Sequence, residues 1–299
     1  MYHTTVLLNE AVEALNIKPD GIYVDATFGG GGHSKLILEK LGTGGKLFGF
    51  DQDDAAEQNA PTDERFTFIN HNFREIKHLL RFEGVKQVDG ILADLGVSSF
   101  QFDTAERGFS YRFDADLDMR MNTSEKRTAA DILNKTDAAG LQTIFGEYGE
   151  VRNARTLANA IVAARIHKPY RRISDALAVI EPQIIGPKMR YLSQVFQALR
   201  IEVNDEMGAL KLLLQQSLEV LKPGGILSVI TFHSLEDRIV KNFMKTGNSD
   251  GILQQDFFGN STKYFNVITK KPIEPSEAEI KANARSRSAK LRIAQKISL

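Results

Sequence analysis

The 299-residue sequence contains no cysteine. This absence excludes disulfide bonds, thiolate metal sites and a cysteine nucleophile, and it fits a reducing compartment such as the cytoplasm. No apolar run approaches the roughly 20 residues that a membrane-spanning helix needs. Residues 1–16 also lack the basic segment that opens a signal peptide. We therefore expect a cytoplasmic protein without a membrane segment.

The formal net charge is zero, because 38 Lys and Arg residues balance 38 Asp and Glu residues. The charge is unevenly distributed: "RIHKPYRR" at 165–172 is one basic cluster, and residues 281–299 hold six basic residues and no acidic one. Each cluster alone also fits a solvated surface, whereas the two together suggest a nucleic-acid partner. The six histidines form no closely spaced pair of the kind that binds zinc, so no metal site is expected.

Short β-rich segments alternate with helical segments in the first third of the chain. Such alternation is typical of a parallel α/β sheet buried on both faces. Residues 104–204 then show helical periodicity without a core strand, and strand character returns after them. We predict an α/β, Rossmann-like sheet built from 1–103 and 205–299, with an all-helical insertion at 104–204. The expected strands are 22–27, 46–51, 66–70, 88–95, 226–232 and 265–272.

Four consecutive glycines in "YVDATFGGGGHSKL", residues 23–36, separate a predicted strand from a predicted helix. A phosphate-binding P-loop needs Gly-Lys followed by Ser or Thr, but the only Gly-Lys pair is followed by Leu47. The dinucleotide pattern G-x-G-x-x-G also fits poorly, because Ser34 or Lys35 stands where its third glycine belongs. What remains is either a loop that lets a ligand approach the backbone or a plain turn.

The ends of the predicted strands favour an adenosine-containing ligand. Asp51 ends the strand after the glycine loop, where a carboxylate can accept both ribose hydroxyls. Phe73 follows the third strand and can lie against adenine or belong to the core, and Asp94 ends a hydrophobic run. Ligands of open α/β sheets bind beyond the carboxyl ends of the strands. Without a phosphate loop, this pattern suits S-adenosylmethionine.

Several longer motifs are specific, including "DATFGGGGHS", "DLGVSSFQFD", "YGEVRNARTLANAI", "FQALRIEVNDE", "VITFHSLEDRIVK" and "NARSRSAKLR". Over nearly the whole chain they resemble the RsmH methyltransferases, also called MraW. The resemblance implies a class I S-adenosylmethionine-dependent enzyme that methylates the exocyclic N4 of a cytidine in the decoding region of bacterial 16S ribosomal RNA, within the small ribosomal subunit. It also implies the residues that hold the methyl donor: Gly31, Gly32, His33, Asp51, Phe73, Asp94 and Gln101.

Two departures from the family pattern concern the shape of loops. Phe100 stands where a proline is usual, and "FDADLDMRM" lacks the usual glycine-proline pair before its leucine. Both lie at the edge of the predicted insertion, so they bear on loop conformation more than on chemistry.

Methylation of an exocyclic amine needs aligned reactants rather than a covalent intermediate. C5 methylation of cytosine generally needs a cysteine nucleophile, which this chain lacks. We hypothesise that Asp94 orients the donor or the amine, with Ser98 and His233 close by, although His233 could equally be a turn histidine. The target base must leave its stack to reach the donor. The candidate residues for binding the surrounding RNA are Arg152, Arg155, Arg165, Lys168, Arg171 and Arg172.

Two other functions remain open at this point. One is methylation of DNA or of a protein, which the two basic clusters do not exclude. The other is a catalytically weak ribosome-assembly factor that binds RNA and keeps the donor site as a relic. The sequence also leaves open whether the protein forms a homodimer, which assembly stage it recognises and which group accepts the amine proton.

Overall fold

The computed structural model describes residues 5–253 and 262–298. The chain divides into two compact units, one formed by Met1–Gly96 with Met207–Leu299 and the other by Val97–Glu206. Below, the first is called the sheet unit and the second the helical unit. No helix within the described residues is long and apolar enough to cross a membrane.

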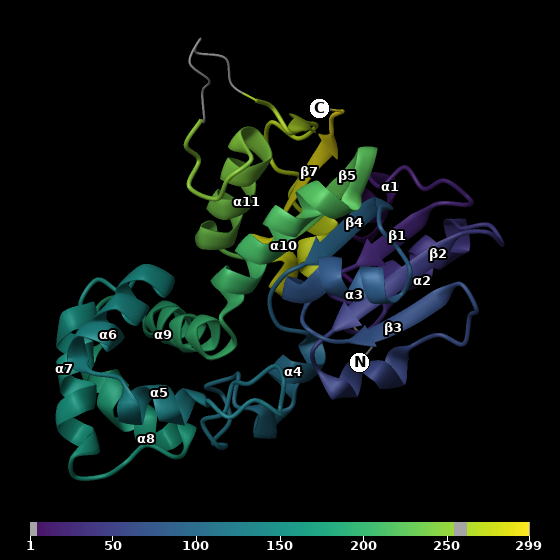
Figure 1. The fold of residues 1–299 in the computed structure, drawn as a ribbon. Coiled ribbons are helices and arrows are strands. Elements are labelled where there is room, and N and C mark those ends of the chain that lie inside the picture. The colour runs from purple at the N-terminus through teal and green to yellow at the C-terminus, as the bar shows by residue number, and fades with distance from the viewer. Residues whose placement is uncertain (1–4, 254–261, 299) are drawn as a thin grey trace. The chain divides into compact units, whose positions relative to one another are not determined.

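The sheet unit contains a seven-stranded sheet with the order β3-β2-β1-β4-β5-β7-β6 (Figure 1). Neighbouring strands from β3 to β5 are parallel, and β7 is antiparallel to both β5 and β6. The chain moves outward from β1 to β3 and then returns to β4, so the switch point lies between β1 and β4. This confirms the expected α/β, Rossmann-like class. The strands are β1 Ile22–Asp25, β2 Lys46–Asp51, β3 Phe66–Asn70, β4 Val88–Asp94, β5 Leu221–Thr231, β6 Phe265–Val267 and β7 Lys290–Lys296.

Helices cover both faces of this sheet, which explains why its central strands are apolar throughout. Successive residues of a strand point to opposite faces: Tyr23 packs with α1 and α2, and Val24 packs with α3, α10 and α11. The same alternation holds for Leu92 and Ile91 in β4. The helices of the unit are α1 Leu8–Glu13, α2 Gly32–Lys40, α3 Ile76–Phe82, α10 Glu206–Val220, α11 Ser234–Thr246 and α12 Glu277–Ala282.

The last strands differ from the prediction. The strand expected at 226–232 begins five residues earlier, because "KPGG" forms an irregular start of β5 whose register shifts against β4. The strand expected at 265–272 is limited to Phe265–Val267. The strand β7, Lys290–Lys296, was not predicted at all, because its sequence lies within the basic stretch 281–299. It lies between β5 and β6, with Leu291 and Ile293 buried.

The helical unit has its own hydrophobic core, centred on side chains such as Phe145, Leu157 and Leu199. The apolar side chains along one face of 151–162 pack into this core, in line with the helical periodicity expected there. Ser174 is not the N-cap of the next helix. It lies inside α8, whose start is capped by Asp175. The helices are α4 Ser99–Asp103, α5 Ala129–Lys135, α6 Ala138–Thr143, α7 Ala154–Arg165, α8 Ile173–Ile180 and α9 Lys188–Asn204.

Candidate active site

Five parallel strands of the sheet unit end at one edge, and a chemically distinctive residue follows or ends each of them. The glycine turn with Gly31 follows β1, and Asp51 is the last residue of β2. Phe73 opens the short helix after β3 and Asp94 ends β4. His233 follows β5 and caps α11. The topology therefore assembles these residues along the edge where open α/β sheets bind their ligands.

The glycine turn is fixed to the end of β2 by Asp51. Gly29 N donates to Asp51 Oδ2 at 2.8 Å, and Asp53 N donates to Asp51 Oδ1 at 2.9 Å. Gly31 is the cap of α2 and has φ +77°, a left-handed conformation that glycine adopts without strain. A Cβ on Gly32 would lie 1.9 Å from the Thr5 hydroxyl oxygen. The turn thus needs glycine for both its conformation and its packing.

The first turn of α2 links this loop to the end of β4. His33 is buried, with Nε2 3.1 Å from the carbonyl oxygen of Val6 and Nδ1 4.0 Å from Asp94 Oδ2. Ser34 Oγ donates to Asp25 Oδ2 at 2.7 Å. His33 and Asp94, which were proposed from the sequence, are therefore neighbours.

Asp94 is the most unusual carboxyl group of this edge. Its Oδ1 is buried and has no hydrogen-bond partner among the described residues. Burial, followed by the nearby carboxylates of Asp25 and Glu236, raises the pKa of Asp94 well above its usual value. Neither Asp25 nor Asp94 forms an ion pair with a lysine or arginine in the described part of the chain. The edge consequently holds buried carboxyl groups that no lysine or arginine of the described chain neutralises.

The pKa values of two further carboxyl groups are raised. Burial raises the pKa of Asp25 to about 6, against hydrogen bonds from Ser34 and Thr27 that lower it. Burial likewise raises the pKa of Asp51 to about 6, against the N–H groups that it accepts. Perturbed groups that cluster at a strand-end edge are characteristic of functional sites.

His233 and Glu236 form a reciprocal cap at the start of α11. Glu236 N donates to His233 Nδ1 at 3.4 Å, and Glu236 Oε2 accepts the N–H groups of Phe232 at 2.7 Å and His233 at 3.3 Å. His233 Nε2 lies 3.1 Å from Glu236 Oε1 without hydrogen-bond geometry, and it is buried without another partner in the described structure. Because Nδ1 accepts the Glu236 N–H, Nε2 carries the proton of the neutral ring and faces the Glu236 carboxylate.

Ser98 and Gln101 belong to the helical unit, where they cap α4. Gln101 N donates to Ser98 Oγ at 3.1 Å, and Ser98 N donates to Gln101 Oε1 at 3.1 Å. They follow Asp94 by four and seven residues in the chain. Their proposed contacts with the donor and the amine remain predictions. Phe100 lies between them in the sequence and is 56% exposed. The phenylalanine that replaces the family's usual proline therefore does not have to fit into the core.

Comparison with known proteins identifies the family. The family model described as the MraW methylase family matches residues 1–297. The chain belongs to the MraW methylase family. A relative from Parabacteroides distasonis is 56% identical over 298 residues, covering 99% of this chain and 98% of its own. One from Bacteroides thetaiotaomicron is 57% identical over 297 residues, covering 99% and 97%. Both are named "Ribosomal RNA small subunit methyltransferase H".

Solved structures resemble the chain only distantly. An rRNA methylase from Streptococcus thermophilus matches with a TM-score of 0.39 and 12% identity, over 96% of this chain and 92% of its own. A likeness this low carries no argument about the site, so the family assignment depends on the sequence relatives.

Membership of the MraW methylase family makes the chain a methyltransferase whose cofactor is S-adenosylmethionine. This donor carries a positively charged sulfonium and an ammonium group. A site that binds it should offer anionic groups without cationic partners. The buried, unpartnered Oδ1 of Asp94, with Asp25 beside it, meets that requirement. The residues at this edge therefore fit the donor.

The six basic residues proposed to grip RNA divide into two groups in the structure. Arg165 donates to the carbonyl oxygens of Leu133 and Thr136 at the end of α5, so its role there is structural. Lys168 pairs with Asp175, and Arg172 with Asp114. Arg152, Arg155 and Arg171 are exposed, and their side chains contact no acidic residue within the described ranges.

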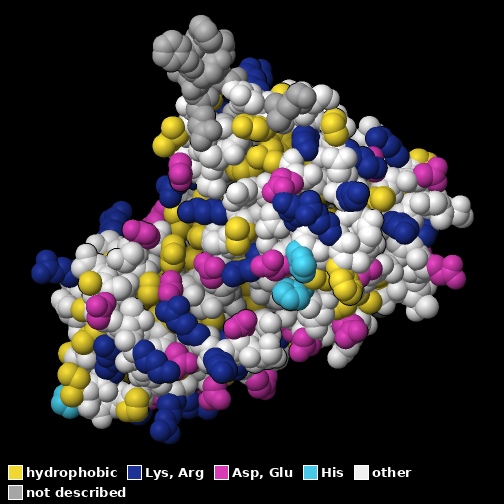
Figure 2. Space-filling model, in the orientation of Figure 1, with side chains coloured by type: hydrophobic (Ala, Val, Ile, Leu, Met, Phe, Trp, Pro, Cys, Tyr) yellow, Lys and Arg dark blue, Asp and Glu magenta, His cyan; other side chains and the backbone are white. Residues whose placement is uncertain are grey.

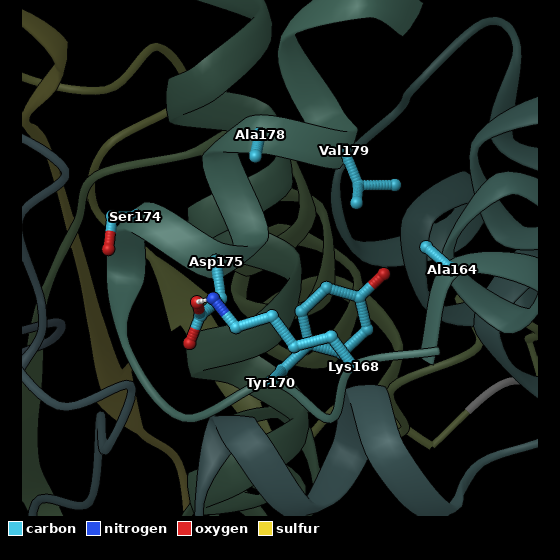
Figure 3. A pocket seen from close by; sticks show the side chains of 7 residues that line it. All are labelled: Ala164, Lys168, Tyr170, Ser174, Asp175, Ala178 and Val179. Carbon is cyan, nitrogen blue, oxygen red and sulfur yellow. Dashed lines mark hydrogen bonds and ion pairs between the residues drawn. The ribbon is translucent and has the colours of Figure 1, made fainter. Parts of the chain in front are cut away.

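Basic and acidic side chains are interspersed on the visible face of the helical unit (Figure 2). A pocket of about 280 Å³ adjoins the "RIHKPYRR" cluster in this unit. Figure 3 shows the Lys168 ammonium meeting the Asp175 carboxylate there. Tyr170 donates its hydroxyl to Ile161 O at 3.1 Å, so these polar groups of the lining satisfy one another or the backbone. The pocket is lined by Ala164, Lys168, Tyr170, Ser174, Asp175, Ala178 and Val179.

Sequence reasoning missed the role of Glu236 and understated that of Asp25. Both carboxylates raise the pKa of Asp94. The three-residue spacing from His233 to Glu236 resembles that of a capping box, which is a signal for a helix start but not for a site. Thr27 was also missed, although its Oγ1 accepts the N–H of Asp94 at 2.6 Å.

Proposed function

We propose that this protein methylates the exocyclic N4 of a cytidine in the decoding region of 16S ribosomal RNA, acting in the cytoplasm on the small ribosomal subunit. The observation that carries the proposal is the end-to-end identity of 56–57% with relatives named for methylation of small-subunit ribosomal RNA. The choice of base and atom comes from the resemblance of the sequence motifs to the RsmH family, and it agrees with the absence of cysteine.

The donor is proposed to lie across the carboxyl edge of β1, β2 and β4. Asp51 would accept the ribose hydroxyls while keeping the Gly29 and Asp53 N–H groups, because each carboxylate oxygen has a further lone pair. Phe73 would lie against the adenine. Asp94 would face the cationic end of the donor, which supports its ionised form despite burial. The complete proposed set is Gly31, Gly32, His33, Asp51, Phe73, Asp94 and Gln101.

The bound donor supplies an electrophilic methyl group on a positively charged sulfur. The amine nitrogen forms a bond to this methyl carbon as the carbon–sulfur bond breaks, and one amine proton must then leave. The protein's contribution is alignment and charge. Asp94 is proposed to orient the amine through Oδ1, which is buried and has no hydrogen-bond partner among the described residues, and His233 is proposed to lie close by. Ser98 is proposed to border the same space.

The helical unit is proposed to hold the RNA around the flipped cytidine. Support comes from three exposed arginines without acidic partners among the described residues: Arg152, Arg155 and Arg171. The other three candidates for RNA binding are Arg165, Lys168 and Arg172. Their contacts within the protein reduce the positive charge that they can offer to phosphate.

The test uses purified protein, labelled S-adenosylmethionine and small ribosomal subunits that lack the modification, beside naked 16S ribosomal RNA. Digestion to nucleosides and mass spectrometry then identify the product. N4-methylcytidine from the subunits is the expected result. A different methylated nucleoside would refute the choice of base, and label in added DNA or protein would favour the alternative substrates. Donor binding without any transfer would favour an assembly factor.

A further inference from the structure

The six basic residues of 281–299 do not form one tail, because two of them are used inside the sheet unit. Arg292 is buried and pairs with Asp237 of α11 at 2.6 Å. Lys296 donates to the carbonyl oxygens of Leu218 and Leu221. The other four lie at or before the start of β7, and we call them the C-terminal basic segment: Lys281, Arg285, Arg287 and Lys290.

The topology brings this segment to the active-site edge of the sheet. Because β7 is antiparallel to β5, its first residue, Lys290, pairs with Thr231, the last residue of β5. His233 follows two residues later in the chain. At the other end of the segment, Glu279 Oε1 in α12 accepts the N–H of Leu7 at 2.8 Å. The preceding carbonyl, of Val6, contacts the His33 ring.

The segment is anchored by buried residues, whereas Lys281 and Arg287 are exposed. Ser286 is fully buried, and its Oγ donates to Asn283 O at 2.8 Å. Ala289 is buried as well, so the short helix Ala284–Ser288 is anchored at both of these positions. Lys281 and Arg287 are exposed and form no ion pair in the part of the chain that the structure describes. Their positive charge is therefore available to an external anion.

We propose that the C-terminal basic segment binds phosphate groups of the substrate RNA beside the reacting cytidine. This rests on the proposed RNA methylation. An extruded nucleotide that reaches the strand-end edge must bring its flanking phosphates over the same edge. Lys281 and Arg287 stand there without internal partners among the described residues, whereas the carboxylates of the edge are proposed to face the cationic donor. The sheet unit thus contributes its own RNA contact, separate from the arginines of the helical unit.

The test compares two charge-matched double variants of the full chain. Lys281→Gln with Arg287→Gln removes two charges from the active-site edge. Lys46→Gln with Lys86→Gln removes two exposed charges from the opposite edge, where β2 and β4 begin. Binding to a 16S ribosomal RNA fragment that carries the target cytidine is titrated at several salt concentrations, and S-adenosylmethionine binding is measured by calorimetry.

Each lost phosphate contact should reduce the slope of log K against log salt by about 0.7–0.9. At 0.15 M salt, two contacts correspond to an affinity loss of roughly 15- to 30-fold. We expect this loss for the first variant, with donor affinity unchanged and with little effect of the control pair. Equal RNA affinity and slope in the first variant and the wild type would overturn the inference, as would an equal loss in the control. Absence of RNA binding by the wild type would instead overturn the proposed function.

Discussion

Replacing Asp25 by Asn should stabilise the donor-free sheet unit at neutral pH. The Asp25 carboxyl is fully buried and its pKa is raised to about 6, mainly because burial disfavours its charge. Asn can still bond Thr27 and the Ser34 hydroxyl, since Oδ1 can accept from Thr27 N and Nδ2 can donate to Ser34 Oγ. The substitution therefore removes the buried charge while hydrogen bonds to Thr27 and Ser34 can still form.

The magnitude follows from linkage between protonation and folding. Between the unfolded pKa of about 3.8 and the folded pKa of about 6, the folded chain keeps a proton that the unfolded chain has lost. Stability contributed by Asp25 therefore falls by about 1.4 kcal/mol per pH unit across this window and is constant above it. The advantage of Asp25→Asn should grow by about 2 kcal/mol from pH 4.5 to pH 7.

Urea denaturation measures this difference in stability. Unfolding is followed by far-ultraviolet circular dichroism, because the chain has no tryptophan whose fluorescence could report it. Asp63→Asn is the control: Arg65 lowers the pKa of the partly exposed Asp63 carboxyl to about 2, so that carboxyl is ionised throughout the tested range. The stability difference between the control and the wild type should not change with pH. The reasoning would be refuted if the stability difference between Asp25→Asn and the wild type also did not change with pH. It would be refuted as well if Asp25→Asn were less stable than the wild type at pH 7.

Three other substitutions test the site. Asp94→Asn should reduce turnover at least tenfold, about 1.4 kcal/mol in transition-state stabilisation, and near-normal turnover by a folded variant would exclude the proposed role. Arg171→Ala should weaken RNA binding and its salt dependence, measured by filter binding, more than Arg172→Ala, because Arg172 is already paired with an acidic residue. Gly32→Ala should destabilise the protein by about 1–3 kcal/mol in thermal unfolding, because its Cβ would lie 1.9 Å from a threonine hydroxyl. Gly30→Ala should be neutral, since a Cβ there meets nothing within 4 Å.

The four strands before the insertion could be predicted closely because their signals are local: β-rich runs bounded by turn residues. β7 could not be predicted, because Lys290, Arg292 and Lys296 make its sequence look like a solvated basic segment. The carboxylate that allows Arg292 to be buried, Asp237, lies 55 residues away in the chain. A charged strand in the sheet becomes recognisable only once that partner is known.

The same distinction between local and long-range signals applies to the site. Asp51 and Asp94 could be placed on one edge because parallel strands share their carboxyl ends. The contact of His33 with Asp94 joins residues 61 positions apart and depends on how α2 packs. Likewise, no local pattern indicates that Arg165 binds the carbonyl oxygens of Leu133 and Thr136. Charge clusters in a sequence therefore overstate the charge available to a partner.

The carboxylates at the strand-end edge are best explained by a cationic ligand. Burial raises the pKa of Asp25, Asp51 and Asp94, so each of these groups reduces the stability of the donor-free fold at neutral pH. No lysine or arginine of the described chain pairs with Asp25 or Asp94, and Asp94 Oδ1 lacks even a hydrogen bond there. A purely structural position would favour an apolar or amide side chain. A donor with positive charges bound there, as proposed, would reverse the balance, because it would lower the free energy of the ionised carboxylates.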